Sequence, residues 1–317
     1  MTSSSSNRPA SSIVTLSQNE QYAPRWSPWK RALYSMAKGR WPMLALVVLI
    51  LIIVVAIFGP QFAPRDPNRQ TLVAKFRAPL QQDRQGVIQY ALGTDQLGRD
   101  VLSRLIYGAR ISLSVGVIAV VIGGTFGVTL GLIAGYFGGR VDDFIMWIAE
   151  IQLAFPFILL AIMVLVVLGP SVPNLILTLG IGQWETYALI ARAQTKSQKE
   201  KEYIEAARAI GGRQLHIMLT GILPNILSPL IVIASFNVAG VILSEASLSF
   251  LGLGVPPSVP TWGAMLADSR DSLIGGVWWL AVLPGLAIML TVLSLNILGD
   301  WVRDFLDPRL RGKGGGL

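Results

Sequence analysis

Few side chains in this sequence could carry out catalysis. The chain contains one histidine, His216, and no cysteine, so most nucleophile–base pairs and most transition-metal sites lack the residues that they require. The phosphate-binding pattern GxxxxGK[ST] is not present, because the Gly312-Lys313 pair is followed by Gly314. We therefore expect no catalytic site, no metal site and no ATP hydrolysis in this chain, and we expect His216 to face solvent.

Three carboxylates fall inside apolar stretches, where an ionised group is costly and by default suggests a function. They are Glu150, Glu185 and Glu245. A proton relay would require a second carboxylate or a histidine in line with one of them, and the sequence aligns none. We favour the simpler interpretation, in which each carboxylate forms hydrogen bonds to a neighbouring helix or faces a wet cavity.

The elements that position these residues are predicted to be membrane-spanning helices. The chain of 317 residues is 52% hydrophobic and 14% charged, whereas soluble domains carry about a quarter charged residues. A membrane-spanning helix needs about 20 mostly apolar residues. Six segments qualify: 42–62, 108–136, 143–168, 174–194, 226–249 and 276–300. We predict an all-α polytopic membrane protein with six transmembrane helices.

Lysine and arginine residues near the spans predict the orientation, because they concentrate in cytoplasmic segments. The N-terminal tail (1–41) has six, the loop at 195–225 has five and the C-terminal tail (301–317) has four. An even number of spans also places both termini on one side, which we take to be the cytoplasm. The segment 63–107 conflicts with this assignment, because it holds seven basic residues and would lie outside.

The predicted organisation has four parts. The first part is a Ser-rich cytoplasmic tail, 1–41, which becomes basic and aromatic before the membrane. The second part holds the first span and an external loop, 42–107. The core follows over 108–300, with the loop 195–225 on its cytoplasmic side, and the last part is a second cytoplasmic tail, 301–317. The net charge of +8 fits contact with anionic lipid better than contact with nucleic acid.

The second span carries a glycine at every fourth position. These positions fall on one face of a helix, where the absence of side chains lets another helix approach closely. We therefore predict a helix-packing row formed by Gly123, Gly127, Gly131 and Gly135.

Prolines interrupt three other spans, at Pro156, Pro229 and Pro284, where we expect kinks. A second group of prolines lies in the segment 250–275. Because proline fixes one backbone angle, we expect a rigid external element there, near the mouth of a path. Its residues are Pro256, Pro257, Pro260 and Trp262.

The loop 195–225 has the pattern of a helical hairpin. Tyr203, Ala207 and Ile210 fall on one face of a first short helix, which the pair Gly211-Gly212 ends, with one glycine expected in a left-handed conformation. The second short helix presents a face formed by Leu215, Met218, Leu219 and Ile222. Two amphipathic helices at the cytoplasmic face fit a partner's groove. A plain connecting loop would explain neither the length of the segment 195–225 nor its two apolar faces.

The stretch "EAARAIG", followed after a gap by "LP", resembles the signature EAA-x3-G-x9-I-x-L-P of membrane subunits of bacterial ABC importers. One position departs: the isoleucine of the signature is Gly221 here, with Ile222 next to it, which implies one looser packing contact. In that family the segment is a coupling helix that docks into a cleft on a separate ATPase. The resemblance therefore implies that the coupling residues are Glu205, Ala206, Ala207, Gly211, Leu223 and Pro224.

Four further stretches resemble the permeases of the dipeptide, oligopeptide and nickel family, in the order of its C-type subunit. They are 92–113, 131–143, 249–266 and 295–310. The resemblance implies a type I ABC importer bundle in the bacterial inner (plasma) membrane, in which this chain and a sister permease form a heterodimer. It also implies two ATPase subunits that hold ATP and Mg, and an extracytoplasmic solute-binding protein.

Peptides are the commonest cargo of that family and are the cargo that we expect, with nickel or another small solute as the alternative. Two other classes remain. An ion-coupled secondary transporter would need a coupling site and usually an internal repeat, and the sequence shows neither clearly. A membrane-anchored scaffold would not need spans that glycine and proline interrupt.

Overall fold

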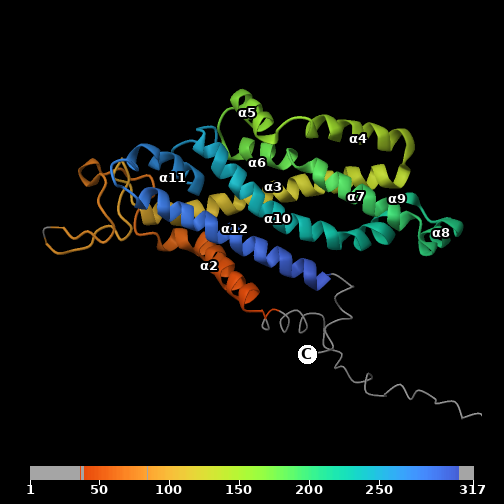
Figure 1. The fold of residues 1–317 in the computed structure, drawn as a ribbon, viewed down its shortest axis with the longest axis horizontal. Helices are drawn as coiled ribbons and strands as arrows, with labels where there is room; N and C mark the ends of the chain where they lie inside the picture. Colours follow the sequence, from red (N-terminus) through yellow and green to blue (C-terminus); the bar gives the residue numbers. More distant parts are fainter. Residues whose placement is uncertain (1–35, 37–38, 84, 307–317) are drawn as a thin grey trace, which may run out of the picture.

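The computed structural model describes residue 36, residues 39–83 and residues 85–306 (Figure 1). Most of the two predicted tails lies outside these described residues. Within the described chain the regular structure is helical, with two isolated β-bridges between residues 82 and 100. The α-helices are α2 (Arg40–Phe62), α3 (Val101–Phe137), α4 (Gly139–Leu153), α5 (Phe157–Leu168), α6 (Val172–Ile181), α7 (Trp184–Lys199), α8 (Glu202–Ala209), α9 (Gln214–His216), α10 (Leu223–Phe250), α11 (Trp262–Ser269) and α12 (Trp279–Leu306).

Four helices of the described chain are long and apolar enough to cross a membrane. They are α2, α3, α12 and a continuous helix, Gln214–Phe250, that contains α9 and α10. The pair α4 and α5 gives a fifth span if it is counted as one, although the two helices are bent by 89°. The prediction of an all-helical membrane protein is confirmed, whereas the count of six spans stays a prediction.

The predicted third span, 143–168, is two helices rather than one. Pro156 is the N-cap of α5, and its ring and missing N–H cannot extend α4. The other two prolines behave differently, because Pro229 and Pro284 lie inside single helices, α10 and α12. One of the three expected interruptions therefore separates two helices.

Two further boundaries differ from the sequence prediction. The segment 174–194 covers α6 and the first part of α7, which separate at Gly182-Gln183. The helix expected over 108–136 begins seven residues earlier, so the loop before it ends at residue 100. Asp100 caps this helix, because its carboxylate accepts hydrogen bonds from the backbone N–H (2.8 Å) and the hydroxyl (2.6 Å) of Ser103.

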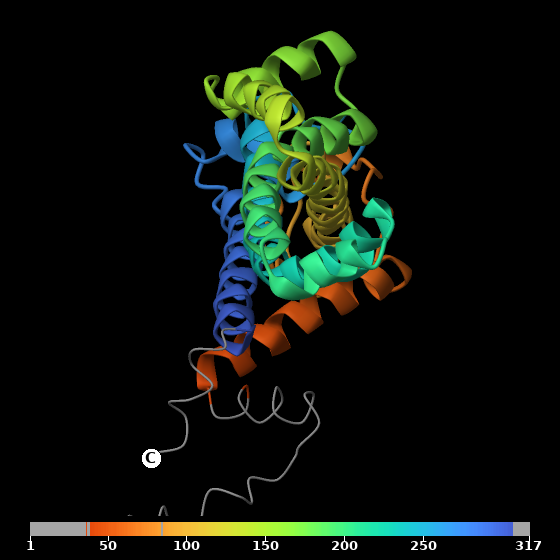
Figure 2. The same ribbon diagram turned by 90° about the vertical axis from the view of Figure 1, so that its right-hand side faces the viewer.

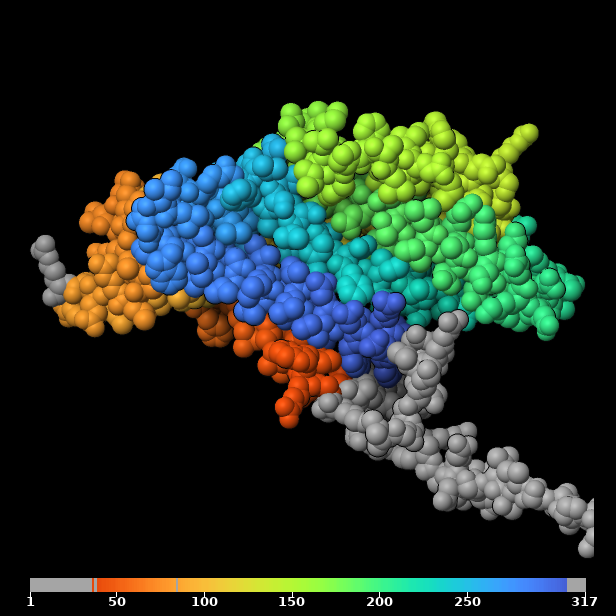
Figure 3. Space-filling view, in the orientation of Figure 1, coloured from red at the N-terminus to blue at the C-terminus, as the bar shows by residue number. Residues whose placement is uncertain are grey.

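Helix α3 runs through the length of the bundle (Figures 1 and 2). Helices α6, α7, α10, α2 and α12 pack around it, and α4 and α5 lie on the outside (Figure 1). The segment 63–100 and α11 lie together at one end of the molecule, and α8 lies at the opposite end (Figure 3). We refer to these as the loop end and the hairpin end.

The glycine row of α3 faces α6 and α7. A Cβ atom built on any of its four members would lie 2.2–2.7 Å from a carbonyl oxygen of the facing segment, closer than real Cβ contacts. The residue pairs are Gly123 with Gly180, Gly127 with Trp184, Gly131 with Ala188, and Gly135 with Arg192. The backbones therefore stand at a separation that excludes any side chain at these positions.

Candidate functional site

The hairpin end consists of α8, a glycine turn and the first turns of the long helix Gln214–Phe250 (Figure 2). Ile204 is the buried side chain of α8, with 1% of its surface exposed. It belongs to one hydrophobic cluster with Ile217 and Ile222 of the long helix. Burial of an isoleucine side chain contributes about 1.5–3 kcal/mol, so Ile204 anchors α8 to the long helix.

The turn after α8 has the hydrogen bonds of a Schellman motif. The N–H of Gly212 donates to the carbonyl of Ala207 (3.0 Å), and the N–H of Gly211 donates to the carbonyl of Arg208 (2.9 Å). Gly211 has φ +82°, a left-handed conformation that favours glycine. The predicted glycine turn is therefore confirmed, and Gly211 is the residue that takes the left-handed conformation.

The second arm of the hairpin is not a separate short helix, contrary to the sequence prediction. It is the start of the long helix, and residues 217–222 are π-helical. A π-turn holds an extra residue, so the adjacent Ile217 and Met218 both turn inward. Leu215 and Leu219, which belonged to the expected apolar face, are 65% and 48% exposed.

The predicted apolar face of α8 is also wrong. Ile204 is buried instead of Tyr203, which is 45% exposed. Helix α8 ends at Ala209, so Ile210 is its C-cap and is 87% exposed. Ile210 therefore falls outside the helix, whereas Ala207, the third residue of the predicted face, is half-buried against the core.

Gly221, the position that departs from the signature, makes room for Ile204. A Cβ on Gly221 would lie 2.9 Å from the terminal methyl carbon of Ile204. Its carbonyl accepts hydrogen bonds from the amide of Asn225 (2.6 Å) and the hydroxyl of Tyr203 (3.3 Å). The departure is thus filled by a neighbour instead of leaving a looser contact. Sequence reasoning missed Tyr203 and Asn225 as links between the arms.

The signature residues lie mostly on the outside of the hairpin. Glu205 and Ala206 are exposed, Gly211 lies in the turn, and Pro224 is exposed in the first turn of α10. Ala207 and Leu223 are half-buried against the core. We define the hairpin surface as the exposed residues Glu205, Ala206, Ile210, Leu215 and Leu219. It combines a carboxylate with large apolar side chains.

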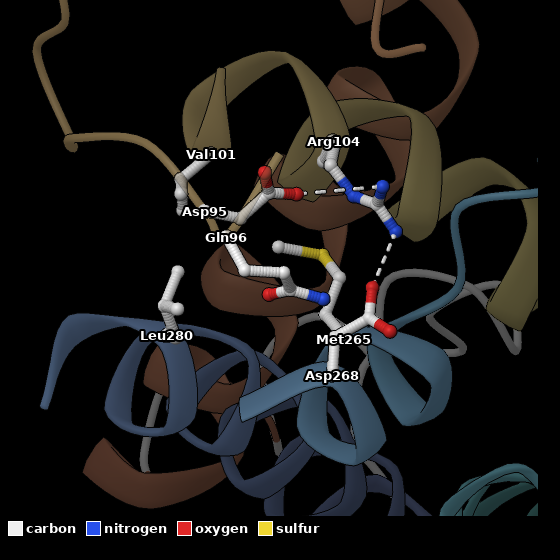
Figure 4. Close-up of a pocket in the computed structure, with 7 residues that line it drawn as sticks. All are labelled: Asp95, Gln96, Val101, Arg104, Met265, Asp268 and Leu280. Atoms are coloured by element: carbon white, nitrogen blue, oxygen red, sulfur yellow. Dashed lines mark hydrogen bonds and ion pairs between the residues drawn. The ribbon is translucent and has the colours of Figure 1, made fainter. Parts of the chain in front are cut away.

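The loop end is held by charges that sequence reasoning missed (Figure 4). Arg99 pairs with Asp95 (2.5 Å) and Asp268 (2.9 Å). Arg104, whose side chain is 2% exposed, pairs with the same two carboxylates at 3.6 and 3.2 Å. The network joins the segment 63–100 and α3 to α11. We refer to Asp95, Arg99, Arg104 and Asp268 as the charge clamp.

The charge clamp also bears on the basic segment that conflicted with the predicted orientation. Two of its seven basic residues, Arg99 and Arg104, are neutralised by carboxylates. A third, Arg65, lies with its guanidinium 4.4 Å from the ring centroid of Tyr90. A count of basic residues alone overstates the charge that this segment presents.

Trp262, a member of the predicted rigid element, is a core residue. It is 2% exposed, and its indole N–H donates to the carbonyl of Leu105 in α3 (3.1 Å). Of the prolines before it, Pro257 is exposed, Pro256 is half-buried and Pro260 is buried. Trp262 therefore attaches α11 to α3, because its backbone N–H also donates to the hydroxyl of Ser112 (3.2 Å). The rigid external element near the mouth of a path stays a prediction.

Two of the carboxylates in apolar stretches form hydrogen bonds with neighbouring groups. Glu245 is fully buried and accepts hydrogen bonds from the hydroxyls of Ser249 (2.8 Å) and Ser112 of α3 (3.4 Å). Glu185 accepts one from the amide of Gln152 in α4 (2.8 Å). Among the described residues no group of three or more His, Cys, Asp and Glu side chains could hold a metal ion. These contacts match the hydrogen-bonding interpretation rather than a relay.

Two family models match this sequence. The model described as binding-protein-dependent transport system inner membrane component matches residues 127–312. The model described as the N-terminal TM domain of oligopeptide transport permease C matches residues 27–81.

Curated relatives cover most of the chain. A di/tripeptide transport system permease protein of Pseudomonas aeruginosa is 41% identical over 285 residues, which is 90% of this chain and 93% of the relative. A dipeptide transport system permease protein of Haemophilus influenzae is 37% identical, over 92% of this chain and 97% of the relative. A glutathione transport system permease protein of Escherichia coli is 41% identical, over 90% and 92%.

A solved structure of the MetNI methionine ABC transporter in an inward-facing conformation shares the fold. Its TM-score is 0.52 at 18% identity, over 64% of this chain and 96% of the matched chain.

Proposed function

This chain belongs to the family of binding-protein-dependent transport system inner membrane components, and we propose that it forms half of the translocation path for short peptides in an ABC importer. Family membership makes the chain a membrane-spanning permease subunit. The names of its relatives support peptides as the cargo. These relatives are permeases of transport systems for di/tripeptides, dipeptides and glutathione, which is itself a tripeptide. The observation that carries the proposal is the match over about nine-tenths of the chain and of each relative.

The proposed assembly has five parts. This chain and a sister permease enclose the path, two ATPase subunits bind the cytoplasmic side, and a solute-binding protein docks outside. ATP and Mg²⁺ belong to the ATPases. The chain crosses the inner membrane six times, with the hairpin end and both termini in the cytoplasm and the loop end outside.

The hairpin surface supports the contact with the ATPase. An ATPase that binds Glu205 and Ile210 can move α8. The buried Ile204 then transmits the movement to the long helix. The long helix then carries it across the bundle, because it is continuous up to Glu245, which contacts α3 through Ser112. The coupling free energy between two sites that are linked in this way is typically about 1–3 kcal/mol.

Two substitutions test the coupling role in proteoliposomes that contain the complete transporter. Gly211→Val places a β-branched residue at φ +82° in open space, so it redirects the hairpin without a clash. Glu205→Lys reverses one exposed charge. We expect both variants to assemble and to lose ATP-driven dipeptide uptake. The control is Gly252→Val, a glycine with the same φ in open space at the end of α10, which should retain uptake.

ATP-driven uptake at the normal rate by both hairpin variants would contradict the coupling role. Wild-type transporter that takes up nickel but no dipeptide would contradict the cargo. The orientation is tested separately, because the chain has no cysteine. A single cysteine at Gln214 should react with an impermeant reagent from the cytoplasm, and one at Gln82 should react from outside.

A further inference from the structure

Tyr136, near the C-terminal end of α3, lies where three helices meet at the hairpin end. Its side chain is buried, with 5% exposed. The guanidinium of Arg208 in α8 lies 5.2 Å from the centroid of the Tyr136 ring. Lys199, the last residue of α7, lies 5.7 Å from the same centroid and donates a hydrogen bond to the Tyr136 carbonyl (2.6 Å). One residue of α3 thus faces a cation from each of two other helices.

This contact gives α8 a second attachment. Ile204 ties α8 to the long helix, whereas Arg208 ties it to α3 through the ring of Tyr136. The ring lies within the distance of about 6 Å at which aromatic faces attract cations. Helix α3 then leads through its glycine row, against α6 and α7, to the charge clamp at Arg104.

We propose that Tyr136 is a positioning residue for energy coupling: it transmits displacement of α8 to α3 by holding Arg208 on its ring and Lys199 on its carbonyl. The inference rests on the proposed function, in which an ATPase moves the hairpin. It adds a route to α3 that runs beside the route through the long helix. Lys199 fixes the end of α7 at the same point, so the ring moves with α7 and α3 together.

A purely structural role for Tyr136 predicts a different outcome. The residue also belongs to the main hydrophobic cluster, so replacement by alanine or by a polar residue would weaken the bundle whatever its role in coupling. The informative replacement is Tyr136→Leu, which keeps an apolar side chain and removes the aromatic face. The matched replacement is Tyr136→Phe, which keeps the aromatic face and removes the hydroxyl.

The experiment measures dipeptide molecules taken up per ATP hydrolysed, in proteoliposomes that contain the complete transporter. We expect Tyr136→Leu to lower this ratio about two- to fivefold while ATP hydrolysis continues, and Tyr136→Phe to keep it near the wild-type value. Arg208→Met should lower it to a similar extent, and Arg208→Lys should retain most of it. The double variant Tyr136→Leu with Arg208→Met should be no worse than the poorer single variant.

An unchanged ratio in assembled Tyr136→Leu would overturn the proposal, and so would an equal loss in Tyr136→Phe. If Tyr136→Leu fails to assemble, Arg208→Met decides, because Arg208 is exposed and its replacement removes no core packing. The failure of the proposed function has a different signature: the wild-type transporter would then show no ATP-driven dipeptide uptake.

Discussion

The two ends of this molecule are held together by different interactions. At the loop end, Arg104 is 2% exposed and pairs with two carboxylates, and Trp262 is buried against α3. At the hairpin end, Ile210 is 87% exposed and Leu215 is 65% exposed. Buried ion pairs join the segments of the loop end, whereas among the described residues no ion pair joins α8 to the bundle. Exposed apolar side chains occur at both ends, and Val73 of the loop end is 92% exposed.

This difference suits two tasks: α11 is held in a fixed position, and α8 is available for contact with a partner. The charge clamp joins α11 to α3 through two arginines that share two carboxylates, so separating the two helices would leave buried charges without compensation. Helix α8 is held more lightly, by Ile204 and by the ring of Tyr136. Because few contacts hold α8, a partner can move the hairpin and the continuous helix that carries it, while the loop end keeps its shape.

The largest expected effect concerns the clamp. Replacing both Arg99 and Arg104 by Met should lower the free energy of unfolding by about 3–5 kcal/mol, because Asp95 and Asp268 would then lose both of their cationic partners. Thermal unfolding in detergent measures this change. Arg110→Ala is the control, since Arg110 lies on the same helix but is exposed, and it should change stability little. Equal effects of the double variant and of the control would remove the contrast between the ends.

A smaller effect is expected at the glycine row. Gly127→Ala should destabilise the bundle by about 1–3 kcal/mol, because its Cβ would lie 2.2 Å from the carbonyl oxygen of Trp184. Gly124→Ala is the neighbouring control, because its Cβ would meet nothing closer than a Tyr187 ring atom at 3.5 Å. A Gly127→Ala protein as stable as Gly124→Ala would mean that α3 and α7 can separate without cost.

The smallest effect is expected at the hairpin. Gly221→Ala should cost about 1 kcal/mol, because its Cβ would meet the terminal methyl carbon of Ile204 at 2.9 Å. Ile204→Val removes that carbon, so the double variant should lose less stability than the sum of the two single variants. Strict additivity in thermal unfolding would show that Gly221 does not accommodate Ile204.

The sequence predicted the parts of the fold that depend on long regular patterns. Runs of about 20 apolar residues located the major helices, and the four-residue glycine spacing located the face of α3 that packs closely. The glycine turn was also predictable, because a left-handed residue at the end of a helix has a strong local preference for glycine.

The rest depended on contacts between residues far apart in the chain. The clamp joins Arg99 to Asp268 across 169 positions, and no local pattern connects them. The apolar face of the second arm was misassigned because the π-turn at 217–222 shifts the helical register, and a period of 3.6 residues cannot anticipate such a shift. Gly221 makes room for Ile204 of α8, a contact between two helices that the signature alone does not predict.

The most direct test compares the two ends in one experiment. Single cysteines are placed at Ile210 and at Ser258, an exposed residue four positions before α11 of the loop end. They are labelled with a thiol reagent in nanodiscs that contain this chain and its sister permease, before and after the ATPases bind. We predict that labelling at position 210 slows at least about tenfold when the ATPases bind and that labelling at position 258 does not change. Unchanged labelling at position 210, with the ATPases shown to be bound, would contradict the account.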